Sequence, residues 1–310
     1  MTALLLDPIF KQHSPGHGHP ECPERYDSVT AALSHLSDFP RIGLRDATPD
    51  ELAFCHSRRY ISTAEREIRD GLDELSTGDT QVCHKSYDVA VQAVGSVLNA
   101  VDEVVERKAN NAFCAVRPPG HHATPARGMG FCIFNNVAIA ARYAQRKHGV
   151  NRVMIADWDV HHGNGTQDIF YEDGSVFFFS THQSPWYPGT GAEDERGEGK
   201  GEGTTLNMPL PSGSGRAEIL GGFQERLLKA AHDFRPELVL ISAGFDSRLG
   251  DPLGQFRLTD QDFRDLTEVM LEIADTHAGG RLVSLLEGGY SLAGLAAGVS
   301  AHVNRLAGLK

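Results

Sequence analysis

The sequence has no long apolar run, no dense basic tract and no closely spaced cysteine pair, and each absence argues against a class of protein. No apolar run approaches the ~20 residues that span a bilayer, so we expect no membrane segment. The net charge is −12 and the lysines and arginines are dispersed, which argues against a nucleic-acid partner or an anionic membrane surface. The five cysteines include no C-x-x-C pair, which favours a reducing, cytoplasmic compartment over a disulfide framework.

Two further segments lack the features of a targeting signal and of a nucleotide-binding loop. Residues 1–6 contain no basic residue before Asp7, so we expect a first strand rather than a signal peptide. Residues 193–204 are rich in Gly, Glu and Lys but do not match G-x-x-x-x-G-K-[ST]. We therefore expect a flexible loop there and no bound nucleotide.

Short apolar runs alternate with segments of helical periodicity along the whole chain. The runs predict buried strands at residues 4–6, 112–116, from 153, 175–180, 236–243 and 281–286. The periodic segments predict helices at 24–36, 57–70, 86–106, 137–148, 217–234, 259–276 and 292–306. With no repeat and no linker, this alternation predicts a single three-layer α/β domain over residues 1–310, with a mainly parallel central sheet flanked by helices.

One stretch, residues 153–166, starts as an apolar strand and then becomes acidic and rich in imidazole. Strand alternation would place Asp157, Asp159 and His161 on the same side. Buried carboxylates are costly unless a cation accompanies them, and carboxylate with imidazole is a ligand set that suits zinc or a similar divalent metal. A hydrogen-bonded cluster without metal is the alternative interpretation of this stretch alone.

Four other predicted strands also end in polar residues: His121-His122, Ser180-Thr181, Asp246 and Tyr290. The carboxyl ends of parallel strands meet at one edge of a sheet, where α/β folds bind their ligands. We therefore expect these residues to lie together, although Asp246 could instead cap a helix and Tyr290 could be an aromatic at the sheet edge.

Such a cluster would suit amide hydrolysis. Asp159, His161 and Asp246 would leave one metal position open, as in catalytic zinc sites. Zinc lowers the pKa of a bound water to about 7 and polarises a carbonyl. Imidazole titrates near neutrality, so His121 or His122 could act as the base, and the Tyr290 hydroxyl could stabilise the oxyanion.

Six motifs carry a family resemblance: R-P-P-G-H-H at 117–122, G-F-C-I-F-N-N at 130–136, D-W-D-V-H-H-G-N-G-T-Q at 157–167, P-G-T-G at 188–191, G-F-D at 244–246 and E-G-G-Y at 287–290. Together they resemble the zinc-dependent histone deacetylase superfamily over nearly the whole chain. Glu287 and Asn164 are similar to the residues of class II and of bacterial histone deacetylase-like amidohydrolases. The resemblance implies the arginase/deacetylase fold.

The resemblance also implies roles for the central residues. Asp159, His161 and Asp246 would bind one catalytic zinc ion. The general base and acid would be His122, oriented by Asn164; because class I members carry Asp at that position, His122 should be less strongly polarised here. His121 would pair with Asp157, and Tyr290 would serve the oxyanion.

Outer residues acquire roles in the same way. Gly130 and Phe131 resemble channel residues that flank the acyl-lysine stem, with Trp186 or Tyr187 as the opposite wall. The resemblance makes Asp79 the rim carboxylate for the substrate backbone and Arg25 the arginine of the acetate pocket. A structural potassium ion would be held by Asp157, Ser180 and the backbone carbonyls of Asp159, His161 and Thr181. The histidines of the loop 13–24 are expected mostly at the surface.

The expected function is hydrolysis of the acyl-amide of an acylated lysine side chain. An acetylpolyamine substrate is the alternative, but Leu253 stands where polyamine-selective relatives carry Glu. The intact catalytic set argues against a non-catalytic binder of acyl-lysine, and the missing extra carboxylates argue against a two-metal ureohydrolase. Apart from an acylated lysine or another small acylated amine, the sequence predicts no partner, neither nucleic acid nor membrane, and leaves the oligomeric state open.

Overall fold

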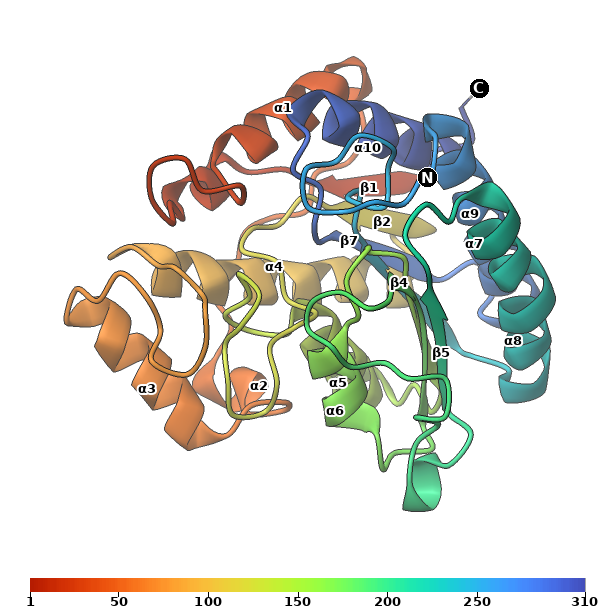
Figure 1. The fold of residues 1–310 in the computed structure, drawn as a ribbon, viewed down its shortest axis with the longest axis horizontal. Helices are drawn as coiled ribbons and strands as arrows, with labels where there is room; N and C mark the ends of the chain where they lie inside the picture. Colours follow the sequence, from red (N-terminus) through yellow and green to blue (C-terminus); the bar gives the residue numbers. More distant parts are fainter. Residues whose placement is uncertain (310) are drawn as a thin grey trace.

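A central sheet of seven strands, covered by helices on both faces, organises the molecule in the computed structural model, which describes residues 1–309 (Figure 1). The strand order is β1-β2-β7-β6-β3-β4-β5, and every neighbouring pair is parallel. The strands are β1 Thr2–Leu5, β2 Asn111–Cys114, β3 Val153–Asp157, β4 Val176–Gln183, β5 Thr205–Leu210, β6 Leu238–Ala243 and β7 Leu282–Leu286. The predicted three-layer α/β fold is thus confirmed.

Helices fill the connections between the strands. They are α1 Glu24–Ala32, α2 Pro49–Leu52, α3 Arg58–Arg69, α4 Ser86–Val105, α5 Asn136–His148, α6 Asn164–Phe170, α7 Arg216–Gly222, α8 Leu228–Phe234, α9 Asp260–His277 and α10 Leu292–Leu306. Shorter helical turns are η1 Pro8–Gln12, η2 Ser34–Leu36, η3 Gly199–Gly201 and the π-helical η4 Phe223–Leu227. Within residues 1–309, no helix has both the length and the apolar character needed to cross a membrane.

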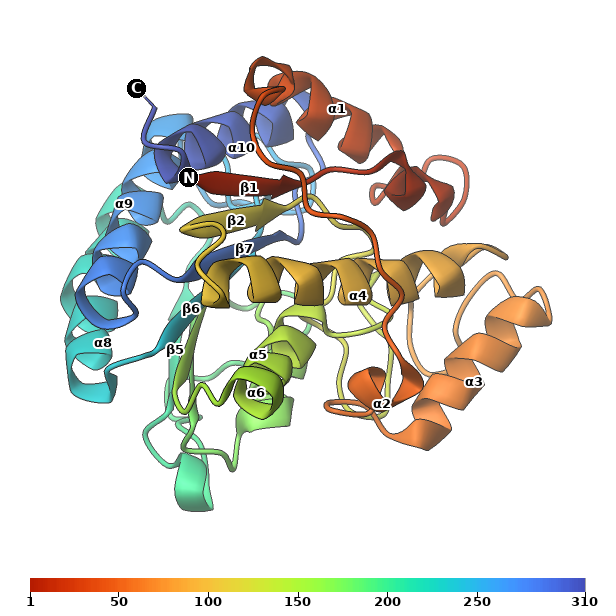
Figure 2. The same cartoon turned by 180° about the vertical axis from the view of Figure 1, so that it is seen from behind.

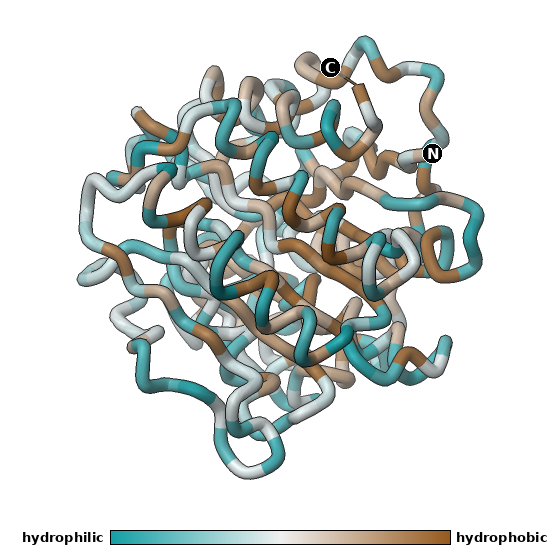
Figure 3. The backbone as a smooth tube through the Cα atoms, turned by 90° about the vertical axis from the view of Figure 1, so that its right-hand side faces the viewer, coloured by the Kyte–Doolittle hydropathy of each residue, from teal (hydrophilic) through white to brown (hydrophobic). Residues whose placement is uncertain are grey.

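Each strand contributes side chains to two separate cores, because successive residues point to opposite faces. Ile155 and Phe178 join the core beneath α3, α4 and α5, whereas Met154 and Phe179 join the core beneath α7, α9 and α10. Seen from behind, α4, α5 and α6 lie in front of the sheet while α8, α9 and α10 lie along its other side (Figure 2). The hydropathy colouring agrees with this layering, with brown segments concentrated inside and teal and white segments mostly outside (Figure 3).

Several boundaries differ from the sequence prediction. The edge strand β5 and the helix α6 were not predicted. Strand β5 contains Pro209, which has no backbone N–H to donate; an edge strand tolerates this because one of its sides has no neighbouring strand. The helix expected at 24–36 ends at Ala32 and is followed by η2. Strand β3 ends at Asp157. The expectation that strand alternation would continue to Asp159 and His161 was therefore wrong.

The loop before α1 also differs. His13 is buried rather than at the surface; its Nδ1 lies 2.7 Å from Oγ of Ser86 and its Nε2 lies 3.3 Å from a carboxylate oxygen of Glu21. This loop therefore packs against the start of α4 and reaches the interior behind the strand ends.

Candidate active site

Loops at the carboxyl ends of β2, β3, β6 and β7 meet at one edge of the sheet. They carry His121 and His122 after β2, Asp159 and His161 after β3, Asp246 after β6 and Tyr290 after β7. This convergence follows from the all-parallel sheet, in which every strand delivers its carboxyl end to the same edge.

Asp159, His161 and Asp246 form a compact cluster. One ligand atom from each residue lies within 4.8 Å of the other two. Nδ1 of His161 is 3.0 Å from Oδ1 of Asp159 and 3.2 Å from Oδ2 of Asp246. Oδ1 of Asp246 accepts the Val160 N–H at 2.8 Å, whereas its buried Oδ2 accepts no hydrogen bond.

The electrostatics of this cluster fit a bound cation. Burial, reinforced by the charge of Asp159, raises the pKa of Asp246 to about 7. Burial alone would lower the pKa of His161, but its contacts with Asp159 and Asp246 outweigh burial and raise that pKa to about 10. Two buried carboxylates, one of which has an oxygen that accepts no hydrogen bond, thus face one imidazole. Carboxylate oxygens with an imidazole nitrogen are a donor set that a zinc-like divalent ion prefers.

The two adjacent histidines beside this cluster have different partners. Nδ1 of His121 lies 2.9 Å from a carboxylate oxygen of Asp157, and Nδ1 of His122 lies 2.8 Å from the amide oxygen of Asn164. Burial lowers the pKa of His121 less than Asp157 and Asp159 raise it, so the result is about 10. Burial, together with the charges of His121 and His161, lowers the pKa of His122 well below its usual value. At neutral pH His121 is therefore cationic, whereas His122 is free to accept a proton.

Tyr290 follows two glycines at the end of β7. Its ring lies 5.9 Å from the ring of Phe131 and 5.1 Å from the guanidinium of Arg25, centroid distances in both cases. Burial and the nearby Asp246 raise the pKa of Tyr290 well above its usual value, so the phenol stays a hydrogen-bond donor. The preceding Gly288 is required by close packing, because a Cβ there would lie 2.0 Å from Oδ2 of Asp246.

A cavity of about 260 Å³ leads to these groups. It is lined by Asp79, His122, Gly130, Phe131, His161, Trp186, Tyr187, Leu253 and Tyr290. All six residues that the sequence assigned to the channel are in this set, along with one residue each from the histidine pair, the metal cluster and the tyrosine position. Gly130 is again required by packing, since a Cβ at this position would lie 2.3 Å from the imidazole of His122.

The rim of the cavity is polar on one side. Oδ1 of Asp79 accepts the Gly130 N–H at 2.7 Å and lies 3.3 Å from the Tyr187 hydroxyl, which donates to it. The indole N–H of Trp186 donates to the carbonyl of Leu253 at 2.9 Å. The Tyr187 ring centroid is 5.2 Å from that of His122, so Tyr187 forms a wall beside the histidine pair.

Arg25 lies fully buried behind Tyr290. It donates to the carbonyl oxygens of Gly289 and Glu287, at 2.7 and 2.5 Å, and to a carboxylate oxygen of Glu21 at 2.8 Å. Asp157 and Ser180, two residues of the predicted potassium site, are register partners in the β3–β4 pair, and Thr181 follows directly. Asp159 and His161 lie in the loop that follows β3 at the same edge.

Four charged residues that sequence reasoning gave no role also contribute to the site. Glu21 bridges Arg25 and Arg117, the first residue of the 117–122 motif, with Glu21–Arg117 contacts at 2.5 and 2.7 Å. Asp251 accepts the backbone N–H groups of Tyr290 and Ser291. The Glu287 carboxylate holds the loop of the histidine pair. The spacing of four residues between Glu21 and Arg25 was the available signal for Glu21. Arg117 and Glu287 lie in two of the six motifs, which do not indicate their distant partners, and nothing local marks Asp251.

Comparisons with known proteins place this arrangement in a family. The histone deacetylase domain model matches residues 19–306. A histone deacetylase-like amidohydrolase of Pseudomonas aeruginosa is 39% identical over 88% of this chain and 73% of its own length. The human polyamine deacetylase HDAC10 is 41% identical over 93% of this chain and 45% of its own length.

The fold agrees with that result. The crystal structure of the HDA15 HD domain superposes with a TM-score of 0.94, at 35% identity, covering 99% of this chain and 89% of that one. The chain belongs to the histone deacetylase family. Family membership and the names of the relatives support a deacetylase enzyme.

Proposed function

We propose that this protein is a zinc-dependent amidohydrolase that removes acetyl or other short acyl groups from lysine side chains. The observation that carries the proposal is the cavity of about 260 Å³, whose apolar walls lead to His122, His161 and Tyr290. An acylated lysine has a long apolar stem and an amide at its end. Apolar walls suit that stem, and the polar groups suit the chemistry at the amide.

Asp159, His161 and Asp246 would hold the zinc ion, which when bound supplies an activated water and polarises the acyl carbonyl. Neutral His122 accepts the proton of the attacking water, while Asn164 fixes its Nδ1. The same imidazole then returns a proton to the departing amine. Tyr290 donates its hydroxyl to the developing oxyanion, and cationic His121, whose ring centroid lies 3.9 Å from that of His122, adds a positive charge next to the base.

Three further parts belong to this proposal. Asp157, Ser180 and the carbonyls of Asp159, His161 and Thr181 would hold a structural potassium ion, supported by the pairing of β3 with β4. Residues 1–310 would form one catalytic domain. All five cysteines are free, which is consistent with a reducing, cytoplasmic environment.

An acetyl-lysine peptide assay with zinc-loaded protein tests the proposal. We expect release of the free amine between about pH 6 and pH 9, where an imidazole base and a zinc-activated water operate, with loss of activity on chelation and recovery on adding zinc. Absence of amine release over this whole range, for short- and long-acyl peptides alike, would reject it.

An acetylpolyamine is the second candidate substrate, because a human relative is named a polyamine deacetylase. The cavity offers Asp79 at its rim as a partner for a distant ammonium group, but the apolar Leu253 lines the other side. We expect kcat/KM to be higher for acetyl-lysine peptides than for acetylspermidine. The reverse order would assign the enzyme to polyamines.

A further inference from the structure

Glu287, at the carboxyl end of β7, is a completely buried carboxylate whose contacts are directed at the loop of the histidine pair. Its Oε2 accepts the backbone N–H of Gly120 at 2.6 Å and that of His121 at 3.2 Å. Its Oε1 accepts the hydroxyl of Ser242, from β6, at 3.3 Å. The side chain thus joins three segments that are far apart in the sequence.

The four residues 287–290 also contact the other parts of the site. The Gly288 N–H donates to Oδ2 of Asp159 at 2.8 Å, and the Tyr290 N–H donates to Asp251 at 2.7 Å. The carbonyls of Glu287 and Gly289 are held by Arg25. One short segment therefore connects the histidine pair, a residue of the metal cluster and the tyrosine.

The loop 117–122 has no helix or strand of its own to fix it. Arg117, the first residue of this loop, is anchored by the carboxylate of Glu21, and the Asn136 amide donates to the Pro118 carbonyl at 3.2 Å. Closer to the imidazoles, the acceptor for Gly120 and His121 is the Glu287 carboxylate. Removing it would leave two buried N–H groups without a partner, which the loop can relieve only by moving.

We propose that Glu287 is a positioning residue that fixes the His121-His122 pair relative to Tyr290 and Asp159. This inference rests on the proposed function for its kinetic consequence. Glu287 acts through backbone hydrogen bonds and not on the substrate. A shift of 1 Å in a reacting group can cost about 100-fold in rate, so a modest slackening of this loop has a large effect on turnover.

Two substitutions separate the reach of the side chain from its charge. Glu287→Gln keeps the length and one amide oxygen that can accept both N–H groups, but loses the charge. Glu287→Asp keeps the charge but withdraws the oxygens by one methylene. We expect Glu287→Gln to retain kcat within about threefold, and Glu287→Asp and Glu287→Leu to lose about 10- to 100-fold in kcat, with KM within about twofold of the original.

Asp262 provides a matched control, because it is also a buried carboxylate that accepts a backbone N–H, from Thr259 at 2.8 Å, but it lies at the start of α9. Asp262→Leu should lower thermal stability without lowering kcat. Equal losses of kcat in Asp262→Leu and Glu287→Leu would overturn the inference in favour of general destabilisation. So would a loss in Glu287→Gln as large as in Glu287→Asp, or a kcat loss that matches a loss of bound zinc.

A second readout does not depend on the proposed reaction. In the metal-free protein, the NMR signals of the His121 and His122 imidazoles should shift in Glu287→Asp and stay close to the original in Glu287→Gln. Unchanged imidazole signals in Glu287→Asp would overturn the inference. If the unsubstituted protein is inactive on every acylated amine but the two variants show the expected imidazole shifts, the proposed function is rejected and the positioning role is supported.

Discussion

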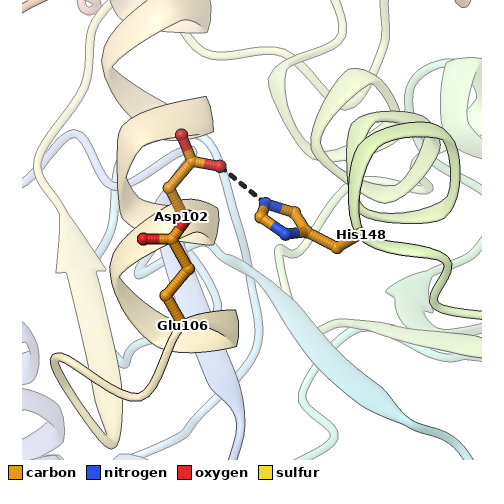
Figure 4. Close-up of side chains that lie close together, drawn as sticks. All are labelled: Asp102, Glu106 and His148. Carbon is orange, nitrogen blue, oxygen red and sulfur yellow. Dashed lines mark hydrogen bonds and ion pairs between the residues drawn. The ribbon is translucent and has the colours of Figure 1, made fainter.

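Two clusters in this molecule each bring two carboxylates and one imidazole within the same distance, yet they differ in burial and in the charges around them. The first is Asp159, His161 and Asp246 at the sheet edge. The second is Asp102, Glu106 and His148, which joins α4 to the end of α5 (Figure 4). In the first, the side chains of Asp159 and Asp246 are 1% and 0% exposed, whereas those of Asp102 and Glu106 are 19% and 43% exposed.

The second cluster already has its counter-charges. Asp102 lies 3.0 Å from the Lys147 ammonium and 2.6 Å from Nε2 of His148, and it accepts the Tyr143 hydroxyl at 3.0 Å. Glu106 pairs with Lys108 at 2.9 Å. Burial would raise the pKa of Asp102, but these hydrogen bonds outweigh it and lower the pKa. Proximity of ligand types is therefore not sufficient: a metal site also needs buried carboxylates that form no ion pair with a lysine or arginine.

The largest effect is expected from removing an aspartate of the first cluster. Asp246→Asn should abolish zinc binding and reduce deacetylation to background, because it removes a ligand and half of the buried negative charge that favours a cation. Zinc content by elemental analysis, together with the peptide assay, measures this. An Asp246→Asn protein that still holds one zinc ion per chain would show that the first cluster is not the metal site.

Tyr290→Phe tests the chemistry beside the first cluster without touching its charge. It should keep zinc and lose about 10²- to 10³-fold in kcat, as expected for a removed oxyanion donor. Measurement of zinc content and of kcat on one acetyl-lysine peptide distinguishes these two effects. A kcat within a factor of three or so of the original would remove Tyr290 from the mechanism.

The sequence predicted the first cluster because its residues follow strands that are recognisable as apolar runs, and because all strands of a parallel sheet end at one edge. It could not predict the second, since α4 and α5 are distant in sequence and their pairing depends on packing over the sheet. Side-chain alternation along a strand was the wrong reason for grouping Asp159 with Asp157. Strand β3 ends at Asp157, and the loop that follows it sets the directions of the Asp159 and His161 side chains.

The hydrogen bonds that hold the site residues in place could not be predicted from the sequence either. The resemblance identified Glu287 as part of a motif, but its partners Gly120 and His121 lie more than 160 residues away. The strand β5 was missed because a glycine-rich loop precedes it and Pro209 interrupts its pattern. Local pattern thus predicts which residues reach the edge, whereas the contacts that hold them there are set by the tertiary fold.

A pH experiment sharpens the contrast between buried and exposed imidazoles. Asn164→Asp places a carboxylate beside Nδ1 of His122, which favours the protonated imidazole and raises the pKa of His122. The neutral base is then lost at a higher pH, so the acid limb of the kcat/KM profile should move to higher pH. The exposed pair Asn304 and His35, at 2.7 Å, supplies the control: Asn304→Asp should leave the profile in place. An unshifted acid limb in Asn164→Asp would contradict the role of His122 as base.

The smallest expected effect completes the comparison. Asp102→Asn removes the central charge of the second cluster but keeps an oxygen that can accept from Tyr143 and Lys147. Because partly exposed ion pairs contribute little, the free energy of unfolding should fall by less than about 1 kcal/mol, while zinc content and kcat stay unchanged. Chemical denaturation and elemental analysis of the same preparation measure both. A loss of bound zinc in Asp102→Asn would mean that the second cluster holds metal after all, and that compensation by Lys147 does not decide which cluster does so.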